Sequence, residues 1–258
     1  MEVALMPSIN YAGCTYNRFV ALKDLDDDTY DAVTWSRHPV TEPPKGKFGL
    51  MFVPSFPDFV GDFVSVPDPH KAFFTLMRTV YGNEYNPKHG ILRGTGFSLG
   101  SNTVIENVAI GNNVTIGNNC SIGGAGFGPV FEADGSSWIV PHIGRVIIED
   151  GVYIGNNVCI DRGCLGDTII RKGARIDNLV HVAHNVDVGE NVCIVAQALI
   201  CGSVRIGART WVGGNACIKD GVTVGSDVII GLCANVVKDV PDGITVVGNP
   251  AKSLVKSR

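Results

Sequence analysis

The stretch IRKGARIDNLVHVAHNVDVGENVCIV, residues 170–195, carries an aliphatic residue at every sixth position. The repeat continues to residue 236 without a break, and each of its positions is Ile or Val. A small or β-branched residue follows each position by four and so precedes the next position by two. This residue and the next aliphatic residue therefore point to the same side of one short strand. The aliphatic positions are Ile170, Ile176, Val182, Val188, Ile194, Ile200, Ile206, Val212, Ile218, Val224, Ile230 and Val236.

The residues between these strands are often Gly, Asn or Asp, which suit tight turns. Short strands and turns at a fixed spacing predict a β-solenoid whose stacked coils bury a continuous aliphatic core. The same period runs through residues 110–122 and 148–160. It is interrupted by a long loop over residues 124–142 and by a shift of register between Ile160 and Ile170. Such interruptions are common places for functional residues.

Composition excludes several classes of function. The chain has 258 residues and a net charge of −4, so no basic surface indicates nucleic-acid binding. No apolar run approaches the roughly 20 residues of a membrane span. The eight cysteines form no C-x-x-C pair, and residues 1–10 lack the features of a signal peptide. These observations predict reduced thiols in a cytoplasmic protein.

Residues 1–88 lack the repeat and predict a separate small α/β domain. Its stretches DAVTWSRHP (31–39) and FVSVPDPHKAFF (63–74) resemble the uridine-binding domain of the UDP-acylglucosamine N-acyltransferases, and this resemblance implies that the domain could bind a nucleotide. The apolar spacing after Asp68 predicts a helix from about Pro69 to Tyr81. The stretch YGNEYNPKHG, residues 81–90, is expected to link this domain to a β-helix over residues 89–258, with residues 124–142 as an inserted loop.

Hexads such as IGNNVTIGNNCSIGG, residues 110–124, resemble those of the hexapeptide-repeat acyltransferases. The resemblance implies a left-handed parallel β-helix with three hexads per coil, and a homotrimer. The expected fold class is therefore mainly β, with a left-handed β-helix and a small N-terminal α/β domain.

Several longer motifs resemble the UDP-acylglucosamine N-acyltransferases of lipid A synthesis. They are GFG (126–128), Trp138, PHIGRVII (141–148), IDRGCLGDT (160–168) and IDNLVHVAHNVDVG (176–189). Two features depart from that group. No His stands near Asp220, where the group has a second histidine, and the stretch VVGNPAKSLVKSR (246–258) instead resembles acetyl-CoA-dependent sugar-amine N-acetyltransferases.

His184 is the candidate catalytic base. It follows the inward-facing Val182 by two residues, so it is expected on a turn, and imidazole suits proton transfer near neutral pH. Gly202 lies three hexads after His184 and is expected beside it in the next coil. The resemblance implies that Asp177 partners the histidine and that the N–H of Gly202 stabilises an oxyanion.

Other residues are candidates for binding, although turn caps, salt bridges, core packing or solvated charges would explain each of them as well. His181 is expected to point outward from its strand, and Phe127 and Trp138 to cover a neighbouring subunit's groove. The substrate-binding candidates are Asn178, His181, Asp161, Arg162 and Trp35, and the donor-binding candidates are Arg205, Lys219, Lys238, Asn249, Pro250 and Lys252.

Together these features predict an enzyme, an N-acyltransferase that moves a short acyl group from acyl-CoA to the amine of a nucleotide-linked amino sugar, without a metal. One alternative is a lipid-A-type transferase that uses an acyl carrier protein. Another is a non-catalytic trimeric binding module. A zinc carbonic anhydrase is a third, but His181 and His184 are expected to point in different directions and no third His has the matching spacing.

Overall fold

The computed structural model describes residues 9–11, 14–16, 18–20, 25, 31–59, 61–82 and 91–254. The chain divides into two compact units. One combines Met1–Asn86 with Gly128–Pro141, and the other combines Pro87–Phe127 with His142–Arg258. Most of the expected link over residues 81–90 lies outside the described residues.

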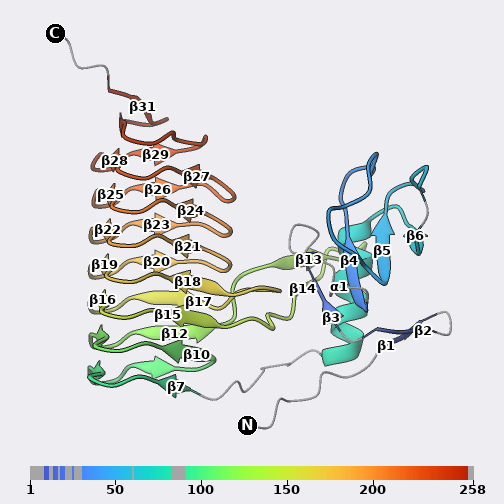
Figure 1. Cartoon of the computed structure of the whole chain (residues 1–258), viewed down its shortest axis with the longest axis horizontal. Helices are drawn as coiled ribbons and strands as arrows, with labels where there is room; N and C mark the ends of the chain where they lie inside the picture. The colour runs from blue at the N-terminus through green and yellow to red at the C-terminus, as the bar shows by residue number, and fades with distance from the viewer. Residues whose placement is uncertain are drawn as a thin grey trace. The chain divides into compact units, whose positions relative to one another are not determined.

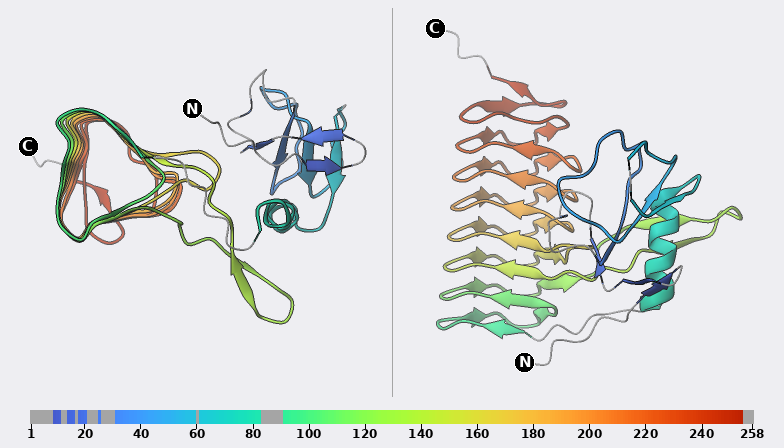
Figure 2. Two further views of the ribbon diagram at one scale, coloured as in Figure 1. Left: turned by 90° about the horizontal axis from the view of Figure 1, so that it is seen from below. Right: turned by 45° about the vertical axis from the view of Figure 1, so that its right-hand side comes forward.

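The larger unit is a solenoid of stacked coils with three flat faces, which appears as a triangle when it is viewed along its axis (Figures 1 and 2). The strands of each face pair in parallel, and the register places each aliphatic position directly beside the same position of the next coil, as in Ile176 beside Ile194. The mainly β solenoid expected from the six-residue period is therefore confirmed.

Each coil contributes one strand to each face. The first face contains β7 (Leu92–Arg93), β10 (Val108–Ile110), β15 (Val146–Ile148), β18 (Thr168–Ile170), β21 (Asp187–Val188), β24 (Arg205–Ile206) and β27 (Thr223–Val224). The second contains β8 (Ser98–Leu99), β11 (Thr115–Ile116), β16 (Tyr153–Ile154), β19 (Arg175–Ile176), β22 (Cys193–Ile194), β25 (Trp211–Val212), β28 (Ile229–Ile230), β30 (Thr245–Val247) and the antiparallel β31 (Lys252–Ser253). The third contains β9 (Val104–Ile105), β12 (Ser121–Gly124), β17 (Cys159–Asp161), β20 (His181–Val182), β23 (Leu199–Ile200), β26 (Cys217–Ile218) and β29 (Asn235–Val236).

The core is the column of aliphatic side chains inside the three faces. Ile176, Val182 and Val188 come from the second, third and first face in turn, and all three are completely buried. Burial of such a side chain contributes about 1.5–3 kcal/mol, and the repetition of the column through the coils makes it the main source of stability.

Three corners join the faces, and we name them by the faces that they follow. The first corner includes residues 189–191, the second 177–179 and the third 183–185. In the early coils the second corner forms a ladder of side-chain amides: the N–H of Asn118 donates to Oδ1 of Asn156 at 2.8 Å, and the N–H of Asn156 donates to Oδ1 of Asn178 at 2.8 Å. The ladder satisfies turn amides that the strands leave unpaired.

The smaller unit contains a parallel sheet of β3 (Arg18–Phe19), β4 (Ala32–Trp35), β5 (Leu50–Val53) and β6 (Phe63–Ser65), packed against α1 (Pro69–Tyr81). The helix has the bounds predicted from the sequence. Asp68 caps it by accepting from the N–H of Lys71 at 2.9 Å, and Phe73 on its buried side meets Phe19 edge to face. A separate hairpin joins β1 (Ile9–Tyr11) and β2 (Cys14–Tyr16).

The loop over residues 124–142, called the insertion below, carries a hairpin that belongs to the smaller unit. Its strands are β13 (Pro129–Phe131) and β14 (Ser137–Ile139). Lys71 of α1 donates to the carbonyl of Phe131 at 3.1 Å, and the guanidinium of Arg78 lies 4.6 Å from the centre of the Trp138 ring. Trp138 therefore packs within its own chain. We had expected it to cover the groove of a neighbouring subunit.

Candidate functional site

The site lies at the third corner, where the insertion leaves the solenoid after β12 and returns before β15. Arg162 joins the two ends of the insertion: its Nε donates to the carbonyl of His142 at 2.9 Å, and its Nη1 donates to the carbonyl of Gly123 at 2.8 Å. Its backbone N–H donates to Gly124 at 2.9 Å, and the residue is only 2% exposed. This structural role replaces the contact with an amino sugar that the sequence predicted for Arg162.

His184 lies on the turn after β20, as predicted. Its Nδ1 is 3.1 Å from Oδ1 of Asn185. The same oxygen accepts from the backbone N–H of Cys164 at 2.9 Å, while Nδ2 of Asn185 donates to the carbonyl of Gly166 at 3.3 Å. These two backbone partners fix the amide, so oxygen faces the imidazole.

This arrangement determines the tautomer of His184. An amide oxygen can only accept, so Nδ1 must carry the proton and Nε2 keeps its lone pair. A histidine in this state can take a proton at Nε2. In this chain the oxygen that meets Nδ1 of His184 thus comes from Asn185, at the place where the resemblance implied Asp177.

Asp177 lies at the second corner, one strand away from His184 along the coil. Its carboxylate accepts from the backbone N–H and side-chain amide of Asn178 at 2.7 and 2.8 Å and from the N–H of Ala196 at 3.2 Å. Asn178 takes part in the amide ladder. Asp177 and His184 are seven residues apart and lie at consecutive corners of the coil. Within one chain the two side chains therefore do not form the pair that the resemblance implied.

Two glycines enclose the imidazole of His184. A Cβ atom on Gly202 would lie 2.7 Å from Cε1 and 2.8 Å from Nε2 of the ring. A Cβ atom on Gly126 would lie 2.9 Å from Cδ2 of the same ring and 2.8 Å from Nε2 of His142. Gly202 is therefore beside His184, where the spacing of three hexads predicted it, and neither position has room for a side chain.

The backbone N–H of Gly202 lies in the turn beside His184, where Oδ1 of Asp220 would also come within 2.7 Å of a Cβ atom on Gly202. In the part of the chain that the structure describes, the N–H of Gly202 has no backbone acceptor, whereas the neighbouring N–H of Ser203 donates to the carbonyl of His184 at 2.9 Å. A donor at this place could bind an oxygen that develops negative charge close to the imidazole.

An acidic group, Asp161, lies close to His181. Oδ2 of Asp161 is 3.7 Å from Nε2 of His181. Burial raises the pKa of Asp161, and the positive charge that His181, His184 or Arg162 can carry opposes this rise. Asp161 thus interacts electrostatically with both imidazoles when they are charged.

The remaining predicted residues are spread over the fold. Lys219 and Lys238 are exposed at the third corner, beyond Gly202. Arg205 is exposed on the first face, where it lines a hollow with Asp187 and Thr223. Asn249, Pro250 and Lys252 are exposed near the end of the last coil, where Oδ1 of Asn249 accepts from Asn235 at 3.2 Å.

Trp35 belongs to the smaller unit. Its ring meets His70 edge to face at 4.9 Å and lies near Phe73 and Phe74, while the guanidinium of Arg37 is 5.9 Å from its centre. The half-buried ring is therefore largely packed into an aromatic cluster.

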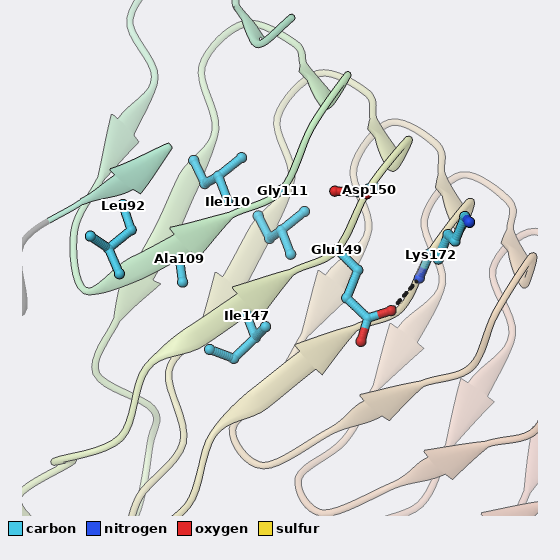
Figure 3. Close-up of a pocket in the computed structure, with 9 residues that line it drawn as sticks. Leu92, Ala109, Ile110, Gly111, Ile147, Glu149, Asp150 and Lys172 are labelled. Atoms are coloured by element: carbon cyan, nitrogen blue, oxygen red, sulfur yellow. Dashed lines mark hydrogen bonds between the residues drawn. The ribbon is translucent and has the colours of Figure 1, made fainter. Parts of the chain in front are cut away.

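Another hollow lies on the first face of the early coils (Figure 3). Leu92, Ala109 and Ile147 form its apolar floor, and Glu149, which accepts from the N–H of Lys172 at 2.8 Å, stands at its edge. No residue that we predicted for the site lines this hollow. Among the described residues, no three His, Cys, Asp or Glu side chains are grouped so that they could hold a metal ion. In the same residues, no helix is long and apolar enough to cross a membrane.

Three residues of this corner were missed as functional candidates. Gly126 and His142 lie in the GFG and PHIG motifs, and Asn185 directly follows His184. The motifs were signals for Gly126 and His142. For Asn185 the signal was weaker, because Asn is common at the same turn position throughout the repeat.

The fold and this corner define the class as a hexapeptide-repeat β-helix protein, and comparisons with known proteins agree. No family model matches the chain. The chain is 44% identical over 155 residues to the UDP-3-O-acylglucosamine N-acyltransferase of Caulobacter sp. (strain K31), a match that covers 59% of this chain and 45% of that protein. It is 45% identical over 127 residues to the enzyme of the same name from Methylobacterium nodulans, covering 49% and 36%.

Among solved structures, the chain is similar to UDP-N-acetylglucosamine acyltransferase from Bacteroides fragilis 9343, with a TM-score of 0.53 and 21% identity over 66% of this chain and 71% of that one. This likeness supports the left-handed β-helix. The resemblance to UDP-acylglucosamine N-acyltransferases expected from the motifs is confirmed by the relatives, of whose length the chain spans less than half.

Proposed function

We propose that the protein is an N-acyltransferase that acts on the amine of a UDP-linked amino sugar, with His184 as the general base. The observation that carries the proposal is the contact of Nδ1 of His184 with Oδ1 of Asn185 at 3.1 Å, which makes Nδ1 the donor and leaves Nε2 basic, on the side of the ring that faces Gly202. The relatives, named UDP-3-O-acylglucosamine N-acyltransferase, supply the class of acceptor.

The proposed reaction uses these two groups in turn. The sugar amine attacks the thioester carbonyl and forms a C–N bond, while Nε2 of His184 takes the amine proton. The carbonyl oxygen becomes an oxyanion that accepts from the N–H of Gly202. Collapse of the tetrahedral intermediate breaks the C–S bond, and the imidazolium returns its proton to the leaving thiolate.

A first experiment tests His184. We expect His184→Ala to lower turnover by about 10²–10⁴-fold, because general-base catalysis is lost. The assay follows acylation of a UDP-linked 3-O-acylglucosamine, with circular dichroism to check the fold. Near-normal turnover of a folded variant would rule out His184 as the base.

For the acyl donor, the relatives favour a lipid-A-type reaction with an acyl carrier protein over the short-chain acyl-CoA that we first expected. Competition between carrier-bound acyl groups and CoA thioesters of increasing length tests this choice. A strong preference for short acyl-CoA would restore the first expectation. For either donor, the exposed Lys219 and Lys238 are the first residues to substitute, since both candidate donors are anionic.

A cytoplasmic homotrimer forms part of the same proposal, by analogy with the group that the motifs resemble. Sedimentation equilibrium of the purified chain measures the oligomeric state directly. A monomer that retains acyltransferase activity would remove the trimer from the proposal but leave the role of His184 unchanged.

A further inference from the structure

The insertion contributes to the surroundings of the proposed base from both of its ends. Gly126 lies near its start and His142 at its end, and both meet the ring of His184. The rings of His142 and His184 have their centres 5.4 Å apart and are inclined by 70°, which is an edge-to-face contact. His142 itself is 1% exposed.

One buried side chain binds both ends of the insertion. Arg162 donates to the carbonyl of His142 from Nε and to the carbonyl of Gly123 from Nη1. The backbone of the returning end is also bound, since the N–H of Ile143 donates to Cys164 at 2.8 Å and the N–H of Gly144 donates to Gly163 at 3.0 Å. A guanidinium held by two carbonyls in this way fixes their separation.

Different neighbours contact different atoms of the His184 ring. Asn185 binds Nδ1, Gly202 faces Cε1 and Nε2, and Gly126 faces Cδ2. Asn185 alone would allow the imidazole to turn about its hydrogen bond. The packing against Gly126 and His142 restricts that rotation, because both sit on backbone that Arg162 holds in place.

We propose that His142 is a positioning residue for His184, and that Arg162 acts through it by holding the insertion against the third corner. The proposal rests on the proposed role of His184 as base. It assigns a function to the two ends of the insertion that is separate from the packing of its hairpin in the smaller unit.

The first test measures the imidazole itself. Diethyl pyrocarbonate modifies accessible histidine nitrogens, and mass spectrometry reports the rate at His184. We expect His142→Ala and Arg162→Met to raise this rate several-fold, because the ring of His184 gains freedom. The controls are His38→Ala, an exposed histidine of the smaller unit, and Arg145→Met, whose side chain pairs with Asp167 at 3.3 Å. Neither control should change the rate at His184.

The second test measures catalysis. We expect His142→Ala to lower kcat by about 10- to 100-fold, as a small misplacement of a catalytic group does, with KM changed by less than about twofold. His142→Phe keeps the ring and should recover most of kcat. If removal of the ring unfolds the corner, as thermal melting would reveal, His142→Phe still tests the proposal.

The outcomes separate this proposal from the one on which it rests. Wild-type modification rates and wild-type kcat in both His142→Ala and Arg162→Met would overturn the positioning role. Normal turnover in His184→Ala, together with faster modification of His184 in the other two variants, would overturn the role of His184 as base. The positioning of its ring by His142 and Arg162 would still stand.

Discussion

The second and third corners of the β-helix have the same turn geometry but use their backbone amides differently. At the second corner, Asn118, Asn156 and Asn178 bind one another in a ladder from coil to coil. At the corresponding turn position of the third corner stand His184 and then Gly202, which has no side chain to accept the N–H of the preceding coil. The comparison shows that His184 and Gly202 occupy, at the third corner, the turn position that the second corner uses for its amide ladder.

The largest effect is expected at Gly202. In Gly202→Ala, Cβ would meet Cε1 and Nε2 of His184 at 2.7 and 2.8 Å, so the ring or the turn must move. We expect turnover to fall by about 10²–10³-fold, since the proposed base and the proposed oxyanion donor are both displaced.

Gly214 provides the matched control, because it occupies the same turn position at the second corner. A Cβ atom there would come no closer than 3.3 Å, to the end of the Leu232 side chain. Gly214→Ala should therefore retain turnover. Equal losses in the two variants would mean that the third corner is no more sensitive than the second.

A smaller effect is expected at Asn185, whose φ of 59° favours Asn or Gly. Asn185→Gly keeps this backbone conformation but removes the oxygen that binds Nδ1 of His184. We expect kcat to fall by about 10- to 100-fold, because either ring nitrogen can then carry the proton.

The control for Asn185 is Asn215→Gly at the second corner, where φ is 56°. This change should affect stability slightly and turnover little. If Asn185→Gly behaves in the same way, then Asn185 has no orienting role, and the tautomer of His184 must be held by another group.

The smallest effect concerns the pH dependence of stability at Asp161. Burial raises the pKa of this carboxyl in the folded protein, so folding favours its protonated form. The contribution to stability is present below the unfolded pKa and is lost as the pH rises through the folded pKa. Asp161→Asn, which stays neutral, should therefore gain melting temperature relative to the wild type at neutral pH.

The same pair of proteins at about pH 4, near the unfolded pKa of Asp, provides the reference. The gain should be smaller there, because the wild-type carboxyl is then largely protonated in the folded state. A gain that is larger in acid than at neutral pH would show that the interaction with the histidines outweighs the cost of burial.

Much of the fold could be predicted from the sequence because a solenoid is held together by local, repeated contacts. The period of six identified the inward side chains, and Ile176 and Val182 are indeed buried. The spacing also placed His184 on a turn and Gly202 beside it. The apolar spacing after Asp68 located α1 with its observed bounds.

Only the tertiary structure decided what surrounds His184. Asn185 is oriented by the backbone of residues 164 and 166, in the turn where the register shifts. Gly126 and His142 reach the ring because the insertion leaves and returns at the same corner, held by Arg162. A sequence period predicts which residues stack at equal spacing, but an insertion breaks that spacing, so its contacts depend on how its ends are anchored in three dimensions.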